Sequence, residues 1–339
     1  MAVTTDRQYR QLLSTAMAYR KSGLEDLVSN SDPVWNTIRE NGNYRPYSGP
    51  EIRVHLLINK QDAQWFTGYD KLRNSPIELV NDAVFTPTNI AVPISFNGTE
   101  LLANEGSTRV MDIMEVAMDG AEVSLRDALE VGILSDGTGS NGRQMIGLAA
   151  AVPTTTNAGV YGGINRATNP IWRTSTFDAQ TAFPTIGTQV DSTTIRPMLS
   201  RILAQRSRGN RSADLLVMSQ EHYEALEQSM VAHQRIVNET RLGKLGFSSL
   251  EFIGSGKRAQ AVLASGLNSA MPSNTTYGLE SRSLHLYYHP SRNMDTLFDG
   301  DGAMPINQDA IAQFLVWNGQ FVNTNPLFTW KLIDSNTAA

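Results

Sequence analysis

The stretch that decides the fold is STRVMDIMEVAMDGAEVSLRDALEVGILS, residues Ser107 to Ser135. Its apolar side chains recur at helical spacing and form one stripe, made of Val110, Ile113, Met114, Ala117, Ala121, Leu125, Ala128 and Leu129. The acidic side chains lie mostly off that stripe, so we predict one amphipathic helix, roughly 40 Å long. Gly120 interrupts it at a cost of about 1 kcal/mol against alanine. We expect this glycine to let another backbone come close.

Two further helices are predicted before this long helix. Its first part predicts an amphipathic helix, because Tyr9, Leu12, Leu13, Ala16 and Met17 recur at helical spacing. A short second helix follows, with Asp32 as N-cap and Pro33 in the first helical position, and it ends near Asn41 and Gly42.

A long two-stranded ribbon is predicted from Pro46 to Phe96. Residues Glu51–Asn59 alternate between apolar and polar side chains, which is typical of a half-buried strand. Residues Asn89–Gly98 read as the return strand, and Pro93 confines that strand to an edge or a bulge. An isolated two-stranded ribbon is marginal in water, so its apolar face requires cover from outside. The aromatic cluster of Trp65, Phe66 and Tyr69 near its tip is favoured as a contact surface over a ligand box.

The remainder of the chain mixes helices and strands. We predict two helices, at 194–208 and 220–236, strands at 214–219, 249–254, 283–290 and 320–333, and a loop rich in small residues at 254–276. This order indicates an α+β fold.

Composition narrows the classes of function. The net charge of −5 argues against a generally basic nucleic-acid binder, and the absence of cysteine excludes disulfides and thiolate sites. The longest apolar run, Ile146–Pro153, is far shorter than the roughly 20 residues of a membrane helix. The N-terminus lacks the apolar core of a signal peptide. We therefore expect no membrane partner and a protein made and used without export.

The search for catalytic chemistry finds only broken motifs. Gly254–Arg258 lacks the first glycine and the hydroxyl residue of a phosphate-binding loop, and Asp299–Gly302 lacks the third oxygen ligand of a calcium loop. His285 and His289 have no acidic ligand nearby in sequence, so surface or interface histidines are favoured over a zinc site. We predict no catalytic residue, no cofactor, no metal and no small-molecule substrate.

A basic and aromatic segment, GGINRATNPIWRT, joins the long helix to the part that follows (Gly162–Thr174). Its two glycines supply freedom for a turn, and Trp172 is expected to anchor packing. No acid lies within it, so Arg166 and Arg173 are expected to pair with carboxylates elsewhere, the acidic face of the long helix being one candidate.

Five stretches in order carry a family resemblance. They are FTGYDKL (Phe66–Leu72), ALEVGILSDGTGSNGRQMIGL (Ala128–Leu148), GGINRATNPIWRT with Asn165 where aspartate is common, LLVMSQEHYEAL (Leu215–Leu226) and TYGLESRSLHLYYHP (Thr276–Pro290). Each is weak alone. Together they cover nearly the whole chain, which resembles the major capsid proteins of tailed double-stranded DNA phages, with the Hong Kong 97 type of fold.

The resemblance implies a division of the chain. It comprises an N-terminal arm at 1–45, an extended E-loop at 46–97, a P-domain at 98–190 with a spine helix at about 107–135, an A-domain at 191–280, and a return to the P-domain at 281–339. The function it implies is self-assembly of hexamers and pentamers into an icosahedral shell. Separate scaffold and portal proteins and non-specifically packaged double-stranded DNA are the implied partners, in a virion assembled in the host cytoplasm.

The candidate contacts between subunits or domains are Trp65, Phe66, Tyr69, Asp70, Arg166, Trp172 and Arg173. Replacing Arg166 or Arg173 with alanine is expected to impair shell assembly more than folding. Lys60 and Lys71 lie in the E-loop, but no partner asparagine is singled out, so covalent crosslinking is not predicted. An encapsulin-like shell around a cargo enzyme is the alternative; a hydrolase or nucleotide enzyme is remote without an intact motif.

Overall fold

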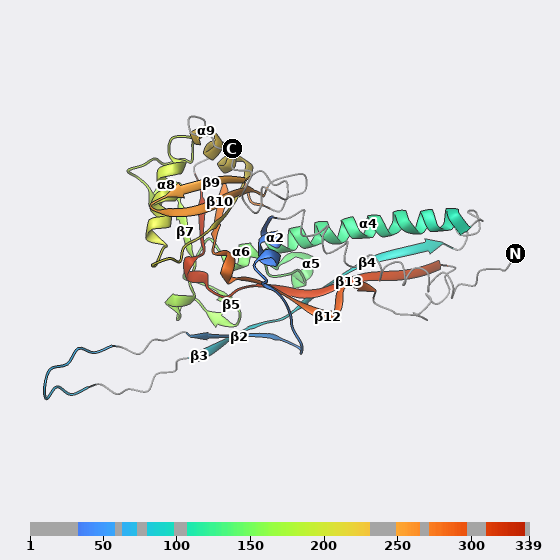
Figure 1. The fold of residues 1–339 in the computed structure, drawn as a ribbon, viewed down its shortest axis with the longest axis horizontal. Coiled ribbons are helices and arrows are strands. Elements are labelled where there is room, and N and C mark those ends of the chain that lie inside the picture. The colour runs from blue at the N-terminus through green and yellow to red at the C-terminus, as the bar shows by residue number, and fades with distance from the viewer. Residues whose placement is uncertain are drawn as a thin grey trace.

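The computed structural model describes residues 33–57, 63–72, 80–97, 107–230, 249–264, 271–296 and 310–335. Figure 1 shows three parts: a long helix above a narrow sheet, a second sheet with helices, and a ribbon that leaves the body. The predicted helix at 9–17 lies outside the described residues. The short helix is confirmed as α2, Pro33–Glu40, and Gly42 after it has a positive φ of 67°.

The narrow sheet has four strands in the order β1-β12-β13-β4. Their bounds are Tyr44–Pro46, Leu284–Thr296, Ala310–Asn323 and Thr88–Asn97, in that order. Only β1 pairs in parallel with its neighbour; the other pairs are antiparallel. The long helix α4, Ser107–Leu134, runs beside this sheet and contacts β4. From here on, P-domain means this unit; it includes β1 and β4, which lie in the ranges expected for the arm and the E-loop.

The amphipathic prediction for the long helix is confirmed where its side chains are described. Met118, Ala121, Leu125, Leu129 and Ile133 are buried in a shared core. Gly120, by contrast, is exposed, and a Cβ atom there would meet no atom within 4 Å. The close backbone approach expected at Gly120 is therefore not found among the described residues.

The second sheet, which we call the A-domain sheet, has six strands in the order β7-β14-β11-β8-β10-β9. Their bounds are Ser175–Asp178, Trp330–Ile333, Thr275–Leu279, Leu215–Met218, Lys257–Leu263 and Ser249–Gly254. Helices α8 (Ile195–Gln205) and α9 (Gln220–Met230) pack on one face. Alternate residues of β8 serve two cores: Leu216 and Met218 face the helices, and Leu215 and Val217 join the core shared with the P-domain.

Short elements connect these parts. They are α5 (Gly139–Gly142), α6 (Leu148–Ala151), β5 (Val160–Tyr161), β6 (Ile164–Asn165), η1 (Pro170–Trp172), α7 (Ala179–Ala182), η4 (Ser281–Ser283) and η5 (Pro326–Phe328).

The ribbon differs from its prediction in its second strand. β2 (Ile52–Leu57) pairs antiparallel with β3 (Val80–Phe85), whereas the predicted return strand is β4 and pairs with β13. The edge position expected from Pro93 is confirmed, because β4 is the last strand of its sheet. Alternation of apolar and polar residues identifies a strand but not the strand it pairs with. The prediction therefore placed this strand in the wrong sheet.

The predicted loop at 254–276 contains a strand. β9 and β10 form an antiparallel hairpin. Ser255 and Gly256 both have positive φ angles, 49° and 75°, as a two-residue hairpin turn of type I′ requires. Buried Ala259 and Ala261 supply the apolar face of β10. Because Ala259 and Ala261 are small, the sequence pattern did not reveal this strand, which shares a core with α8 and α9.

Two glycines provide a matched test of packing. Gly278 lies opposite Trp330, and a Cβ atom there would overlap the buried indole. We expect Gly278→Ala to lower the free energy of unfolding by about 1–3 kcal/mol through overpacking. Gly120→Ala should raise it by about 1 kcal/mol, because the helix gains propensity without a clash. Urea unfolding midpoints measure both; shifts of the same sign would contradict this packing.

His222 gives the A-domain a dependence on pH. It is 1% exposed, and its Nδ1 lies 2.8 Å from the Thr276 hydroxyl. Burial lowers the pKa of His222 from 6.5 to about 4, against the opposing charges of Asp334 and Glu221. The neutral ring is therefore the form that the folded state accepts.

Unfolding releases His222 to its ordinary pKa, so the unfolded state binds more protons between pH 6.5 and about 4. The stability contribution of the neutral ring is fully present above pH 6.5. It is lost as the pH falls through this window, with a total of about 3 kcal/mol. His222→Gln should flatten the slope of unfolding free energy against pH between 6.5 and 4. An unchanged slope would show that His222 is not its source.

Candidate functional site

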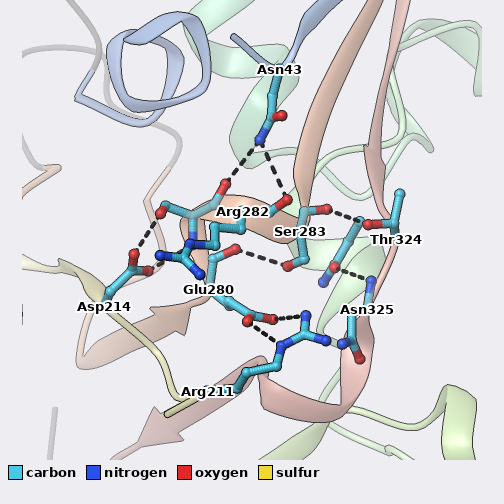
Figure 2. A network of polar contacts seen from close by, with 10 residues as sticks. Asn43, Arg211, Asp214, Glu280, Arg282, Ser283, Thr324 and Asn325 are labelled. Carbon is cyan, nitrogen blue, oxygen red and sulfur yellow. Dashed lines mark hydrogen bonds and ion pairs between the residues drawn. The ribbon is translucent and has the colours of Figure 1, made fainter. Parts of the chain in front are cut away.

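The chain crosses from the A-domain sheet to the P-domain sheet at Glu280–Ser283, between β11 and β12 (Figure 2). Segments from both domains meet there. We define the interdomain joint as Asn43, Arg211, Asp214, Glu280, Ser281, Arg282, Ser283, Thr324 and Asn325. None of the joint residues was predicted as a site, although TYGLESRSLHLYYHP was identified as a motif.

A buried carboxylate lies at the centre of the joint. The Glu280 side chain is 4% exposed, and Arg211 donates to both of its oxygens, at 2.7 and 2.9 Å. Hydrogen bonding to Glu280 raises the pKa of Arg211. The guanidinium also lies 5.0 Å from the ring centre of Phe328. A buried carboxyl group requires such a partner, and Arg211 supplies both hydrogen bonds and the opposite charge.

Side chains satisfy the backbone of the crossing segment. Asp214 accepts from the Ser281 amide at 2.7 Å and from its hydroxyl. Asn43 Nδ2 donates to the carbonyls of Ser281 and Arg282, at 3.3 and 3.4 Å. The amide and hydroxyl of Thr324 both donate to the Ser283 carbonyl. Because buried backbone groups must be paired, these contacts hold the two domains in one arrangement.

The segment Gly162–Thr174 forms a second connection, built on a buried arginine. Arg166 is 3% exposed, and its Nη2 donates to the carbonyls of Ala150 and Ala151, at 2.9 and 2.8 Å. Those carbonyls lie at the end of α6, where a helix leaves its acceptors unpaired. Arg166 also lies 5.1 Å from the ring centre of Tyr161.

The carboxylate pairing predicted for the two arginines is wrong within the described residues. Arg173 donates from Nε to the Arg166 carbonyl and from Nη2 to the Ala167 carbonyl, both at 2.6 Å. Trp172 is buried as expected, and its Nε1 donates to the Tyr161 carbonyl at 2.9 Å. Backbone carbonyls exposed by short turns are the nearer acceptors, which sequence spacing does not reveal.

This segment also holds the base of the ribbon. The Val84 amide of β3 donates to the Gly162 carbonyl at 2.9 Å. Phe85 is buried against the Tyr161 ring, with ring centres 5.1 Å apart. Gly162 has a positive φ of 58°, and a Cβ atom there would lie 2.6 Å from Phe85. Glycine is therefore required both by the turn and by the close approach of Phe85.

The described residues of the subunit leave the tip of the ribbon largely uncovered. Trp65 and Tyr69 are fully exposed, at 102% and 107%, and Phe66 is 63% exposed. Asp70 closes the tip turn: its Oδ2 accepts from the Thr67 amide at 2.9 Å, and its own amide donates to the Thr67 carbonyl. The four predicted tip residues thus lie together at the end of the ribbon, whereas Arg166, Trp172 and Arg173 lie in the segment that is hydrogen-bonded to the ribbon's base.

A groove lies where the base of the ribbon meets the two domains. Its volume is about 790 Å³. Its lining includes Arg45, Leu56, Trp172, Arg208, Leu327 and Phe328. We call it the basal groove.

The other candidates for chemistry do not combine into a site. No set of three His, Cys, Asp or Glu side chains could hold a metal ion in the part of the chain that the structure describes. Burial, together with the charge of Arg45, lowers the pKa of His285 to about 4. Gly254–Arg258 is the hairpin turn between β9 and β10, and Asp299–Gly302 lies outside the described residues. In the same described ranges, no helix combines the length and apolar character of a membrane span.

The burial of Arg166 revises the expectation for its replacement. Arg166→Ala leaves two buried carbonyls without a donor, so we expect the free energy of unfolding to fall by about 2–4 kcal/mol. Arg173→Ala is the matched control, because Arg173 is partly exposed, and its loss should cost about 1 kcal/mol. Denaturant unfolding of both variants measures the difference. If Arg166→Ala has the stability of the wild type but does not assemble, the original prediction holds, namely that the change impairs assembly more than folding.

Comparisons with known proteins place the fold. No protein-family model matches the chain, and no curated protein matches it. Solved structures do match. A chain of the cyanophage A-1(L) capsid asymmetric unit aligns with a TM-score of 0.63 at 16% identity, over 88% of this chain and 92% of that one. A capsid of a native GTA particle aligns with a TM-score of 0.54 at 11% identity, over 88% and 89%.

A structure from Mycobacterium phage Ogopogo aligns with a TM-score of 0.50 at 13% identity, over 88% of this chain and 91% of that one. Each of these matches covers almost nine-tenths of the chain. The expectation drawn from the ordered motifs is confirmed at the level of fold: this chain has the fold of tailed-phage major capsid proteins, the Hong Kong 97 type.

Proposed function

We propose that this protein is the structural subunit of a phage head, assembling as hexamers and pentamers into an icosahedral shell around double-stranded DNA. The single observation that carries the proposal is the fold match to a cyanophage capsid chain, at a TM-score of 0.63 over 88% of this chain. The protein would be a component of the virion, assembled in the host cytoplasm.

The ribbon supports an assembling role. Its base is built into the core through Phe85, whereas its tip presents Trp65 and Tyr69 wholly to solvent. Each aromatic side chain buries about 150–250 Å² when covered, or about 4–6 kcal/mol gross. Association entropy offsets much of that gain, so single contacts are weak and a closed shell sums many of them.

The interdomain joint supports the same role from another side. A shell subunit must present its contact surfaces in a fixed geometry, and the Glu280–Arg211 pair and the satisfied crossing segment provide that rigidity. The partners that follow from the proposal are other copies of the chain, separate scaffold and portal proteins, and non-specifically packaged DNA.

The experiment is electron microscopy of the purified protein over a concentration series, with light scattering for mass. We expect closed particles. We expect the variant Trp65→Ala with Tyr69→Ala to keep wild-type thermal unfolding but to lose particles, because the tip contributes nothing to the subunit core.

Ile253→Ala is the matched control, because Ile253 is an exposed apolar side chain, at 59%, on the β9–β10 hairpin away from the ribbon. Protein that stays monomeric at every concentration, alone and with its scaffold, would contradict the proposal. Native particles that contain a cargo enzyme in place of DNA would favour the encapsulin-like alternative.

A further inference from the structure

The basal groove gathers basic side chains from elements that lie far apart in the sequence. Its lining includes Arg45 from β1, His285 from β12, and Arg208 and Arg211 from the turn that follows α8. No aspartate or glutamate is among its lining residues. Its volume of about 790 Å³ is within the range of sites that hold a small molecule. Folding assembles this cluster from separate segments, so no local motif reveals it.

The backbone fixes where two of these arginines start. β1 pairs with β12 in a register that sets Arg45 opposite Tyr287, so Arg45 shares a face of the sheet with Tyr287 and His285. In the turn after α8, the Arg208 amide donates to the Arg211 carbonyl at 2.9 Å, and the Arg211 amide donates to the Arg208 carbonyl at 3.1 Å. Both arginines are thus carried on backbone that hydrogen bonds hold in place.

The positive charge of the groove exceeds what the described residues compensate. Arg211 is committed to Glu280, at 2.7 Å. Arg45 and Arg208 are exposed, and no ion pair joins either one to a carboxylate of the described residues. The groove therefore offers two guanidinium groups to an anion.

The two imidazoles of the groove differ in their contacts. His55 is paired, because its Nδ1 lies 2.5 Å from Asp82 Oδ1. His285 has its Nδ1 buried without a partner among the described residues. Its pKa of about 4, lowered by burial and by the charge of Arg45, leaves the ring neutral at pH 7. A buried ring nitrogen without a partner is a group that a bound ligand, or a water bound with it, would satisfy.

Apolar side chains form much of the remaining wall. Val54 and Leu56 come from β2, Ile171 from η1 and Leu327 from η5, and all four are half-buried. A ligand with a carbon body would remove their exposed surface from water. The groove therefore suits a molecule with an anionic end and an apolar body.

We propose that the basal groove binds an organic phosphate monoester, with its phosphate on Arg45 and Arg208 and its body against the half-buried side chains of β2, η1 and η5. A phosphate monoester carries a charge of about −1.5 to −2 at pH 7, which matches two guanidinium groups better than a single negative charge does. Guanidinium groups also bind phosphate oxygens in bidentate geometry. The site lies within one subunit, so the inference stands independently of the proposed function.

Isothermal titration of the purified full chain tests the site. The probes are inorganic phosphate, hexyl phosphate and adenosine 5′-monophosphate. We expect at least one of the two esters to bind about tenfold or more tightly than inorganic phosphate, because its body covers the apolar wall. The tighter ester identifies the body as aliphatic or nucleoside. Hexyl sulfate, which keeps the aliphatic body but carries one charge, should bind about tenfold more weakly than hexyl phosphate.

Variants assign the two ends of the ligand. Arg45→Ala and Arg208→Ala should each weaken binding of the tighter ester by about tenfold, at an unchanged unfolding temperature. Leu327→Ala should weaken binding of the ester but leave that of inorganic phosphate within about twofold, a difference that a loss of folding would not produce. Arg53→Ala is the matched control, because Arg53 is an exposed arginine of β2 that pairs with Glu51 and does not line the groove.

Four outcomes would overturn the inference. They are no binding of either ester, equal binding of hexyl sulfate and hexyl phosphate, equal weakening by Arg53→Ala and the groove variants, and displacement of the ester by double-stranded DNA at a lower concentration of phosphate groups. The last would show a general polyanion surface, since DNA offers phosphate diesters without an apolar body at each phosphate. A tighter ester that depends on Arg45, Arg208 and Leu327 supports the site, whether or not the protein forms closed particles.

Discussion

The buried carboxylate of Glu280 is the constraint on which the rest of this structure depends. The chain passes from one sheet to the other through a segment in which Glu280, Ser281 and Ser283 are buried, so their polar groups require partners. Arg211 neutralises the carboxylate, and Asp214, Asn43 and Thr324 satisfy the backbone beside it. These contacts join the two domains at the crossing. A flexible crossing would let the A-domain and P-domain present their surfaces at variable angles.

The two ends of the ribbon differ in burial. At its base, Phe85 fills the space that Gly162 leaves open, and a backbone hydrogen bond from Val84 ties β3 to the connecting segment. At its tip, Trp65 and Tyr69 have no contact that would shield them. The base of the projecting ribbon is thus part of the folded core, and the exposed tip is left for the contact with another copy that we propose.

Local periodicity accounts for what could be predicted. The stripe of α4, the helix α8 and the edge position imposed by Pro93 all follow from residues close together in the chain. Strand β3 was missed because Asn81 and Asp82 break its apolar pattern, and β10 because alanines make its buried face. The pairing of β4 with β13 was also missed. The local alternation of apolar and polar residues does not identify a pairing partner that lies some two hundred residues away.

The sequence by itself determined the long helix, the α+β class, the exposed aromatic tip and, through five ordered motifs, the likeness to phage capsid proteins. Only the tertiary structure decided which acceptors the arginines use and where the domains are locked. Asn43 reaches Ser281 across 238 positions of sequence, and Arg166 turns to helix carbonyls instead of the acidic residues expected. The physical reason is desolvation: a charged group pairs with whatever acceptor folding buries beside it, and that neighbour is set by packing and not by spacing along the chain.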